Sequence, residues 1–302
     1  MHSEEYVVAR RTLLDALEAL AEHRDALVLV GAQAVYLHTG AAQFAVAEST
    51  TDGDVVIDPR MLGRDPEIAS AMRGARFFLD ERDGEQLVGV WASMREIGGV
   101  PAKVTVDLLV PDALGGAGRR AARVPPHEKG SMLKVHGLEA ALVDHSVMSI
   151  AALEGTDARS FSIKVAGPTA LLIPKTIKLS ERVTAGALER GQADRVKPKD
   201  ALDVLRLLQA MPSAQLADGF VGLVGDDVAG AVAREALGQL PGLFGGADSP
   251  GSQLAAEAAA PEPAEVIAAS CAALCQELIE GLHARGIDVS SVSSSSGRTI
   301  PP

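Results

Sequence analysis

The chain has 302 residues, of which 47% are apolar and 3% aromatic, and 40 acidic against 28 basic residues give it a net charge of −12. Its length and composition indicate a globular protein of about two domains. The acidic balance excludes a surface that is basic throughout and coats nucleic acid, although it leaves a local basic site open.

Several other classes are excluded by composition. Cys271 and Cys275 are the only cysteines, so neither a disulfide framework nor a four-cysteine zinc site can form. Their spacing in an apolar helical run predicts two buried thiols. The sequence has no uncharged apolar run of 18 residues and no signal-like N-terminus, so we expect a cytoplasmic protein without a membrane span.

The first 125 residues predict a sheet domain with flanking helices. Helical patterns at 6–23, 32–38 and 66–73 alternate with strand patterns at 26–30, 54–57, 76–79, 87–91 and 102–110. This order indicates an α+β (α/β) fold built on a small mixed sheet.

The remainder of the chain predicts mostly helices. After a mixed connecting region with one strand at 161–165, helical patterns occupy 170–183, 198–210, 227–240 and 265–285. A Gly/Ala/Pro-rich linker is expected at 241–263 and a disordered serine-rich tail from 290 to 302. We therefore expect a sheet domain at 1–125, a mainly helical domain at 126–245, and an appendage at 246–302.

Two carboxylates stand out at the start of a strand. Asp52 and Asp54 lie two residues apart, ahead of the apolar residues 55–57. Side chains at i and i+2 of a strand point to the same face, so both acids should face one point. Two like charges held together need a cation between them, and Mg²⁺ prefers such oxygen ligands.

A third acid, Asp107, lies inside the most apolar strand pattern. Val104, Val106, Leu108 and Val110 should share one face of it, and Thr105 and Asp107 the other. If this strand neighbours the strand of Asp52 and Asp54, three carboxylates converge. Read singly, each acid would more simply be a solvated edge residue or a helix cap.

Upstream, the residues around Gly31 and Ala32 form a strand, a tight turn and a helix start. Backbone N–H groups at such a turn can hold a phosphate. The turn, the paired acids and the distant strand acid together equip a site for metal-dependent attack of a hydroxyl on the α-phosphate of a nucleotide.

These residues resemble the DNA polymerase β-type nucleotidyltransferase superfamily. The residues that carry this resemblance are 29–32, 51–54 and 106–108. Further along, 174–182 and 194–206 resemble the signature of the AbiEii-like toxins of type IV toxin–antitoxin systems, a basic helix followed by Lys-Asp-x-x-Asp. The resemblance covers about 26–210.

The resemblance implies specific roles. Asp52, Asp54 and Asp107 would be catalytic residues holding two Mg²⁺ ions. Gly31 and Ala32 would form the triphosphate turn, and Lys178, Arg182, Lys199 and Asp200 would complete the nucleotide site. The substrate would be a nucleoside triphosphate, the acceptor an RNA such as a tRNA 3′ end, and a cognate antitoxin would be a partner. For the lysines, a solvated helix face is the alternative. For Asp200 and Asp203, the alternative is that they stabilise the start of a helix.

The chain departs from the family pattern at three places. Ala32 stands where a glycine or serine is usual, Gly53 separates the two acids and should loosen the strand, and residues 48–51 lack the usual arginine. Two other functions therefore stay open: a nucleotidyltransferase with a small cationic acceptor, as in aminoglycoside modification, and a nucleotide-binding module without catalysis.

Overall fold

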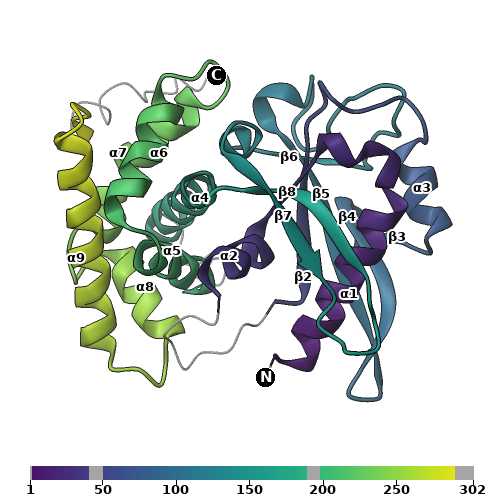
Figure 1. Cartoon of the computed structure of the whole chain (residues 1–302), viewed down its shortest axis with the longest axis horizontal. Coiled ribbons are helices and arrows are strands. Elements are labelled where there is room, and N and C mark those ends of the chain that lie inside the picture. The colour runs from purple at the N-terminus through teal and green to yellow at the C-terminus, as the bar shows by residue number, and fades with distance from the viewer. Residues whose placement is uncertain (1, 41–49, 189–197, 290–302) are drawn as a thin grey trace. The chain divides into compact units, whose positions relative to one another are not determined.

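The structure of the protein, a computed structural model, describes residues 2–40, 50–188 and 198–289. The chain forms two compact units. One consists of residues 1–37 and 47–167, and the other of residues 38–46 and 168–302. The first unit contains a mixed sheet with three helices and the second is helical (Figure 1), which confirms the predicted α+β class.

The sheet unit contains eight described strands in one sheet. In space seven of them follow the order β3-β4-β5-β2-β1-β8-β7, and β6 pairs with β5 off this path. The strands are β1 (Leu27–Val30), β2 (Asp52–Ile57), β3 (Phe78–Arg82), β4 (Glu85–Ile97), β5 (Val100–Pro111), β6 (Leu133–Val135), β7 (His145–Ala151) and β8 (Ser160–Ala166). The β2–β5, β1–β8 and β5–β6 pairs are parallel and the others antiparallel.

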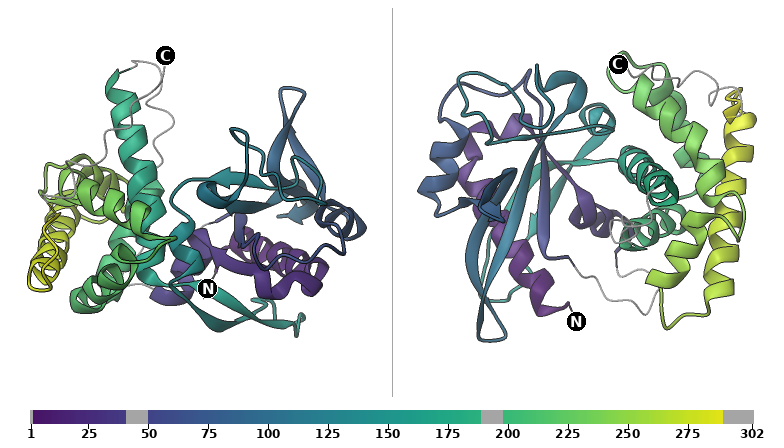
Figure 2. Two further views of the ribbon diagram at one scale, coloured as in Figure 1. Left: turned by 90° about the horizontal axis from the view of Figure 1, so that it is seen from above. Right: turned by 180° about the vertical axis from the view of Figure 1, so that it is seen from behind.

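The helices of this unit are α1 (Glu4–Ala19), α2 (Gly31–Thr39), whose last residues fall in the other unit, and α3 (Ile68–Gly74). Helix α1 lies along one face of the sheet (Figure 2). Its Val8 and Ala9 form a buried cluster with Val104 of β5. As predicted, Val104, Val106, Leu108 and Val110 are buried while Thr105 and Asp107 are only partly so.

Strand β7 was not expected from the sequence, and the strand predicted at 161–165, which is β8, joins the sheet instead of the helical domain. The expected sheet domain ends at 125, whereas the sheet unit extends to Gly167. The reason is that β8 pairs in parallel with β1, and β7 pairs with β8. The last two strands of the connecting region therefore complete the sheet.

The helical unit contains six described helices, two more than the sequence predicts. They are α4 (Pro168–Leu188), α5 (Pro198–Ala210), α6 (Ser213–Val224), α7 (Gly230–Phe244), α8 (Pro250–Ala258) and α9 (Ala264–His283). The predicted linker at 241–263 is wrong, because α7 continues to Phe244 and α8 follows it. Helix α8 packs against α5 and α9 and buries Ala255 and Ala256.

Helix α9 is the one helix among the described residues that is long and apolar enough to cross a membrane. In the structure it packs against α6 and α8 (Figure 1), with Leu278 and Leu282 on its buried side. Cys271 and Cys275 are buried free thiols, as predicted, and burial raises the pKa of each to about 12. The predicted tail at 290–302 lies outside the described residues.

Candidate functional site

The three predicted carboxylates lie on one face of two neighbouring strands. Strands β2 and β5 pair in parallel, with Asp54 opposite Asp107 and Asp52 opposite Thr105. Residues directly opposite each other in a sheet point to the same face, and so do residues two apart in a strand. All three acids are partly exposed. The expected adjacency of the two strands is therefore confirmed, while the role of the acids as metal ligands stays a prediction.

This face is the one that α1 does not cover. Gly53, between the two acids, points to the opposite face, where a Cβ at position 53 would lie 3.1 Å from Cδ1 of Leu13 on α1. Instead of loosening the strand, Gly53 lets α1 pack directly on the backbone of β2. The alternation of strand side chains then leaves Asp52 and Asp54 on the side away from α1.

Gly31 and Asp54 are in direct contact. Gly31 has a φ of +68°, and a Cβ at this position would overlap the carboxylate of Asp54. The turn after β1 therefore needs a glycine both for its backbone conformation and for the space that Asp54 occupies. Because α2 begins at Gly31, the carboxylate lies at the positive end of a helix, where negative charge is stabilised.

Ala32 is explained by packing. Its side chain is buried within the first turn of α2, with 7% of its surface exposed. A small apolar residue suits this place, and a hydroxyl there would be buried as well.

A chain of buried hydrogen bonds fixes the start of β2. Gln33 on α2 donates from Nε2 to the carbonyl of Asp52 at 2.9 Å, and its Oε1 accepts from Nε of Arg10 at 2.8 Å. Thr50 Oγ1 also donates to Oδ1 of Asp52 at 2.6 Å. The sequence shows Gln33 and Arg10 only as polar positions of two helices, so it gives no signal for this positioning role.

The carboxylates suit a divalent cation in type, but they do not form a closed cluster. Among the residues that the structure describes, no three His, Cys, Asp or Glu side chains gather closely enough to hold a metal ion. Asp52 accepts from Thr50, and Asp54 lies against Gly31. To share one ion, these side chains would turn towards Asp107.

The second predicted set of residues gathers within the helical unit. The carboxylate of Asp200 on α5 accepts ion pairs from three cations of α4. The distances from Oδ2 are 2.9 Å to Nζ of Lys178 and 3.2 Å to Nη1 of Arg182, and Oδ1 lies 3.7 Å from Nζ of Lys175. The predicted proximity of Lys178, Arg182 and Asp200 is therefore present. Lys199, next to Asp200, is partly buried.

Asp203 holds the buried cation of this set. Its Oδ2 accepts from Nζ of Lys175 at 2.7 Å, and both side chains are almost fully buried. Lys175 therefore does not lie on a solvated helix face. Burial works against ionisation of Asp200, but Lys175, Lys178 and Arg182 outweigh it and lower its pKa. The carboxylate stays ionised at neutral pH.

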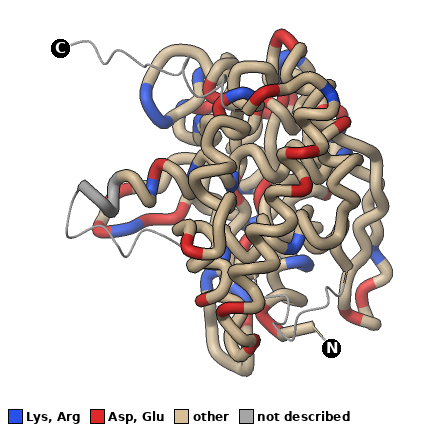
Figure 3. Tube along the Cα trace, turned by 90° about the vertical axis from the view of Figure 1, so that its left-hand side faces the viewer, with Lys and Arg blue, Asp and Glu red and all other residues tan. Residues whose placement is uncertain are grey.

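The cations of this set outnumber its acids. Four cations, Lys175, Lys178, Arg182 and Arg206, form ion pairs with the two acids Asp200 and Asp203. Lys178 and Arg182 are the solvent-accessible members, with 44% and 27% of their side chains exposed. Over the chain as a whole, basic and acidic positions are interspersed (Figure 3). Three further basic residues of this part of the sequence, Arg190, Arg195 and Lys197, lie outside the described residues.

Comparisons with known proteins identify no family. The sequence matches no protein-family model and no curated protein. The structure is similar to a crystal structure of an antigenic nucleotidyltransferase-like protein from Paracoccidioides brasiliensis, at 17% identity and a TM-score of 0.39, over 78% of this chain and 94% of that one. A similarity this distant assigns no activity, so the functional argument rests on the residues.

Proposed function

We propose that the protein is a divalent-metal-dependent nucleotidyltransferase of the DNA polymerase β type. One observation carries the proposal: Asp54 and Asp107 lie opposite each other on parallel strands, with Asp52 on the same face. The contact between Asp54 and the turn at Gly31 adds to it, because it places a helix N-terminus beside the acids. Three acids on one face of a sheet suit a cation that lies between them.

The proposed reaction moves a nucleoside monophosphate to a hydroxyl. The acceptor oxygen bonds to the α-phosphorus of a nucleoside triphosphate, the bond to the bridging oxygen breaks, and pyrophosphate leaves with that electron pair. The hydroxyl proton passes to the carboxylate of Asp107. Asp52 and Asp54 would hold Mg²⁺, which supplies charge neutralisation on the phosphates. The N–H groups at the start of α2 would bind the triphosphate.

We propose RNA, such as a tRNA 3′ end, as the acceptor. The cations gathered around Asp200 support this, since Lys178 and Arg182 expose cationic groups suited to phosphate oxygens. The AbiEii-like pattern of α4 and α5 supports a toxin that works in the cytoplasm and is paired with an antitoxin. Expression should then arrest growth, and Asp54→Ala should relieve the arrest.

The acceptor is tested with nucleoside triphosphates labelled at the α-phosphate. Each of the four is mixed with the protein, Mg²⁺ and total RNA. We expect one RNA band to take up label and the Asp54→Ala variant to transfer none. Binding of this RNA should weaken steeply as salt rises. Absence of transfer to RNA, protein or small molecules with all four triphosphates would refute the proposed activity.

Two alternatives have support of their own. The net charge of −12 favours a small cationic acceptor such as an aminoglycoside. In that case label would move to the small molecule and not to RNA. The open arrangement of the three acids favours a nucleotide-binding module without catalysis. That module would bind a triphosphate in calorimetry and release no pyrophosphate.

A further inference from the structure

The two end strands of the sheet differ in how their outer edges are protected. Strands β3 and β7 are the terminal strands of the sheet path. Strand β3 carries Asp80, Glu81 and Arg82, and its register shifts between Leu79 and Glu81. Charges and bulges of this kind prevent an edge strand from pairing with another chain.

Strand β7 has none of these protections. Its seven residues, His145–Ala151, include no Asp, Glu, Lys, Arg or Pro, and its pairing with β8 runs without a shift. Within it Val147 is 67% exposed, one of the most exposed large apolar side chains in the described part of the chain. An uncharged regular edge strand of this length is suited to pairing with a further strand.

The hydrogen-bond pattern shows which backbone groups face outward. Ala152 N–H donates to Arg159 and Gly167 N–H donates to Asp144, in the register that pairs Met148 with Ile163. Bonded and non-bonded pairs alternate in an antiparallel ladder. Even-numbered residues of β7 therefore bond to β8, while His145, Val147 and Ser149 direct their N–H and C=O groups away from it. Ala151 follows the same pattern, and its carbonyl accepts from Arg10.

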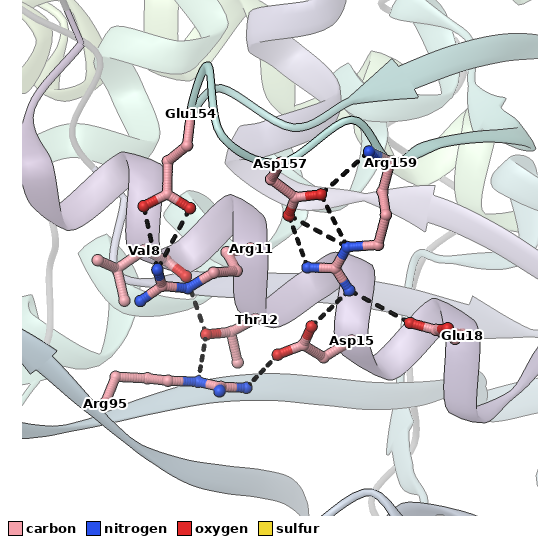
Figure 4. A network of polar contacts seen from close by, with 9 residues as sticks. All are labelled: Val8, Arg11, Thr12, Asp15, Glu18, Arg95, Glu154, Asp157 and Arg159. Carbon is pink, nitrogen blue, oxygen red and sulfur yellow. Dashed lines mark hydrogen bonds and ion pairs between the residues drawn. The ribbon is translucent and has the colours of Figure 1, made fainter.

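The edge is also held in place. Figure 4 shows α1 bound to the β7–β8 connection by ion pairs, in which Arg11 contacts Glu154 at 3.0 Å and Arg159 contacts Asp15 at 2.6 Å. Arg159 also pairs with Asp157 at 2.7 Å. Because these contacts fix the end of the hairpin, a partner strand would meet an ordered edge and lose little entropy in ordering it.

We infer that β7 pairs antiparallel with β7 of a second copy of this chain, with Val147 on the two-fold axis. In this register His145 of one copy lies opposite Ser149 of the other, so the outward N–H and C=O groups of residues 145, 147 and 149 satisfy one another. The exposed Val147 side chains meet across the axis, and Ser146 lies opposite Met148. No charged pair is opposed anywhere along the strand. This self-complementarity is what favours a second copy over an unrelated peptide.

Sedimentation velocity over a range of protein concentrations tests the dimer. We expect the full chain to shift from monomer to dimer mass, and Val147→Lys to weaken the association at least about tenfold, because two lysines would meet on the axis. A mixture of Val147→Lys and Val147→Glu should form a heterodimer. The matched control is Phe78→Lys, which places a lysine at a partly exposed residue of the β3 edge. It should leave the dimer intact.

Three outcomes would overturn the inference: a wild-type chain that is monomeric at every concentration, a Val147→Lys variant that dimerises like the wild type, or a mixture that forms no heterodimer. Circular dichroism would check that the variants are folded. Because residue 147 is exposed and directs its N–H away from β8, these substitutions should leave the β7–β8 pair undisturbed.

Discussion

Two features of the structure require a glycine at position 31. The residue has a positive φ, and the carboxylate of Asp54 fills the space that a Cβ would take. From the sequence, Gly31, Asp52, Asp54 and Asp107 could be selected, because strand periodicity and acid placement are local signals. Arg10 and Gln33 could not, because their hydrogen bonds join residues that are 23 positions apart.

Gly31→Ala should cost both stability and activity. We expect a loss of about 2–4 kcal/mol in the free energy of unfolding, from backbone strain and from displacement of Asp54. Urea unfolding measures it. The matched control is Gly84→Ala, since Gly84 has a φ of +80° but no atom within 4 Å of an added Cβ. It should cost about 1 kcal/mol from strain alone. Equal losses in the two variants would show that Asp54 does not occupy this space.

Asp200 should give the protein a pH-dependent contribution to stability. Its pKa in the folded state is lower than the ordinary 3.8, so the contribution is complete above that value and is lost as the pH falls through the folded pKa. Asp200→Asn should lower the free energy of unfolding by about 2 kcal/mol at neutral pH. The gap from the wild type should shrink below about pH 4. Urea unfolding of both proteins from neutral pH to below pH 4 measures this difference. A difference that stays constant over this pH range would contradict the lowered pKa of Asp200.

At the scale of elements, the sequence predicts best where burial alternates. Strand β5 carries four buried apolar residues on one face and Asp107 on the other, so its type and faces are evident. Strand β7 lacks this contrast, with serines and exposed Val147 beside buried Ile150. Helix α8 is composed mostly of small residues and begins with a proline, so it has the composition of a linker. Its packing against α5 and α9, which no local pattern reports, makes it a helix.

Truncation tests whether the C-terminal part is an appendage behind a linker or a packed part of the helical unit. A chain that ends at Gly245 loses α8 and α9, and with them buried Ile267, Leu278, Ile279 and Leu282. Burial of these four side chains contributes about 6–12 kcal/mol, which is comparable to the net stability of a domain. We expect this truncated chain to be insoluble or to unfold without cooperativity. A chain that ends at Val289 should retain the wild-type melting curve. A soluble, cooperatively folding chain ending at Gly245 would support an appendage instead.

At the scale of the whole molecule, the net charge of −12 is a sum over two different local settings. In the sheet unit, three acids share one face, where a bound cation would offset them. In the helical unit, four cations gather around the two acids Asp200 and Asp203. The overall charge therefore does not decide whether the partner is a nucleic acid. The expected fold class could be predicted, but the division at Gly167 depends on pairing between strands over 100 residues apart, as in β1 and β8.

The most direct test of the account measures pyrophosphate release from a nucleoside triphosphate with Mg²⁺ and RNA. We compare the wild type with Asp54→Asn and Asp107→Asn. The control is Asp112→Asn, because Asp112 is a partly exposed acid directly after β5 that pairs with Lys134. We expect turnover to fall about 100-fold or more in both site variants while they stay folded, and to be unchanged in the control. Two results would contradict a nucleotidyl-transfer site on this face. In one, Asp54→Asn and Asp107→Asn turn over at the wild-type rate. In the other, the wild type shows no turnover with any triphosphate and acceptor.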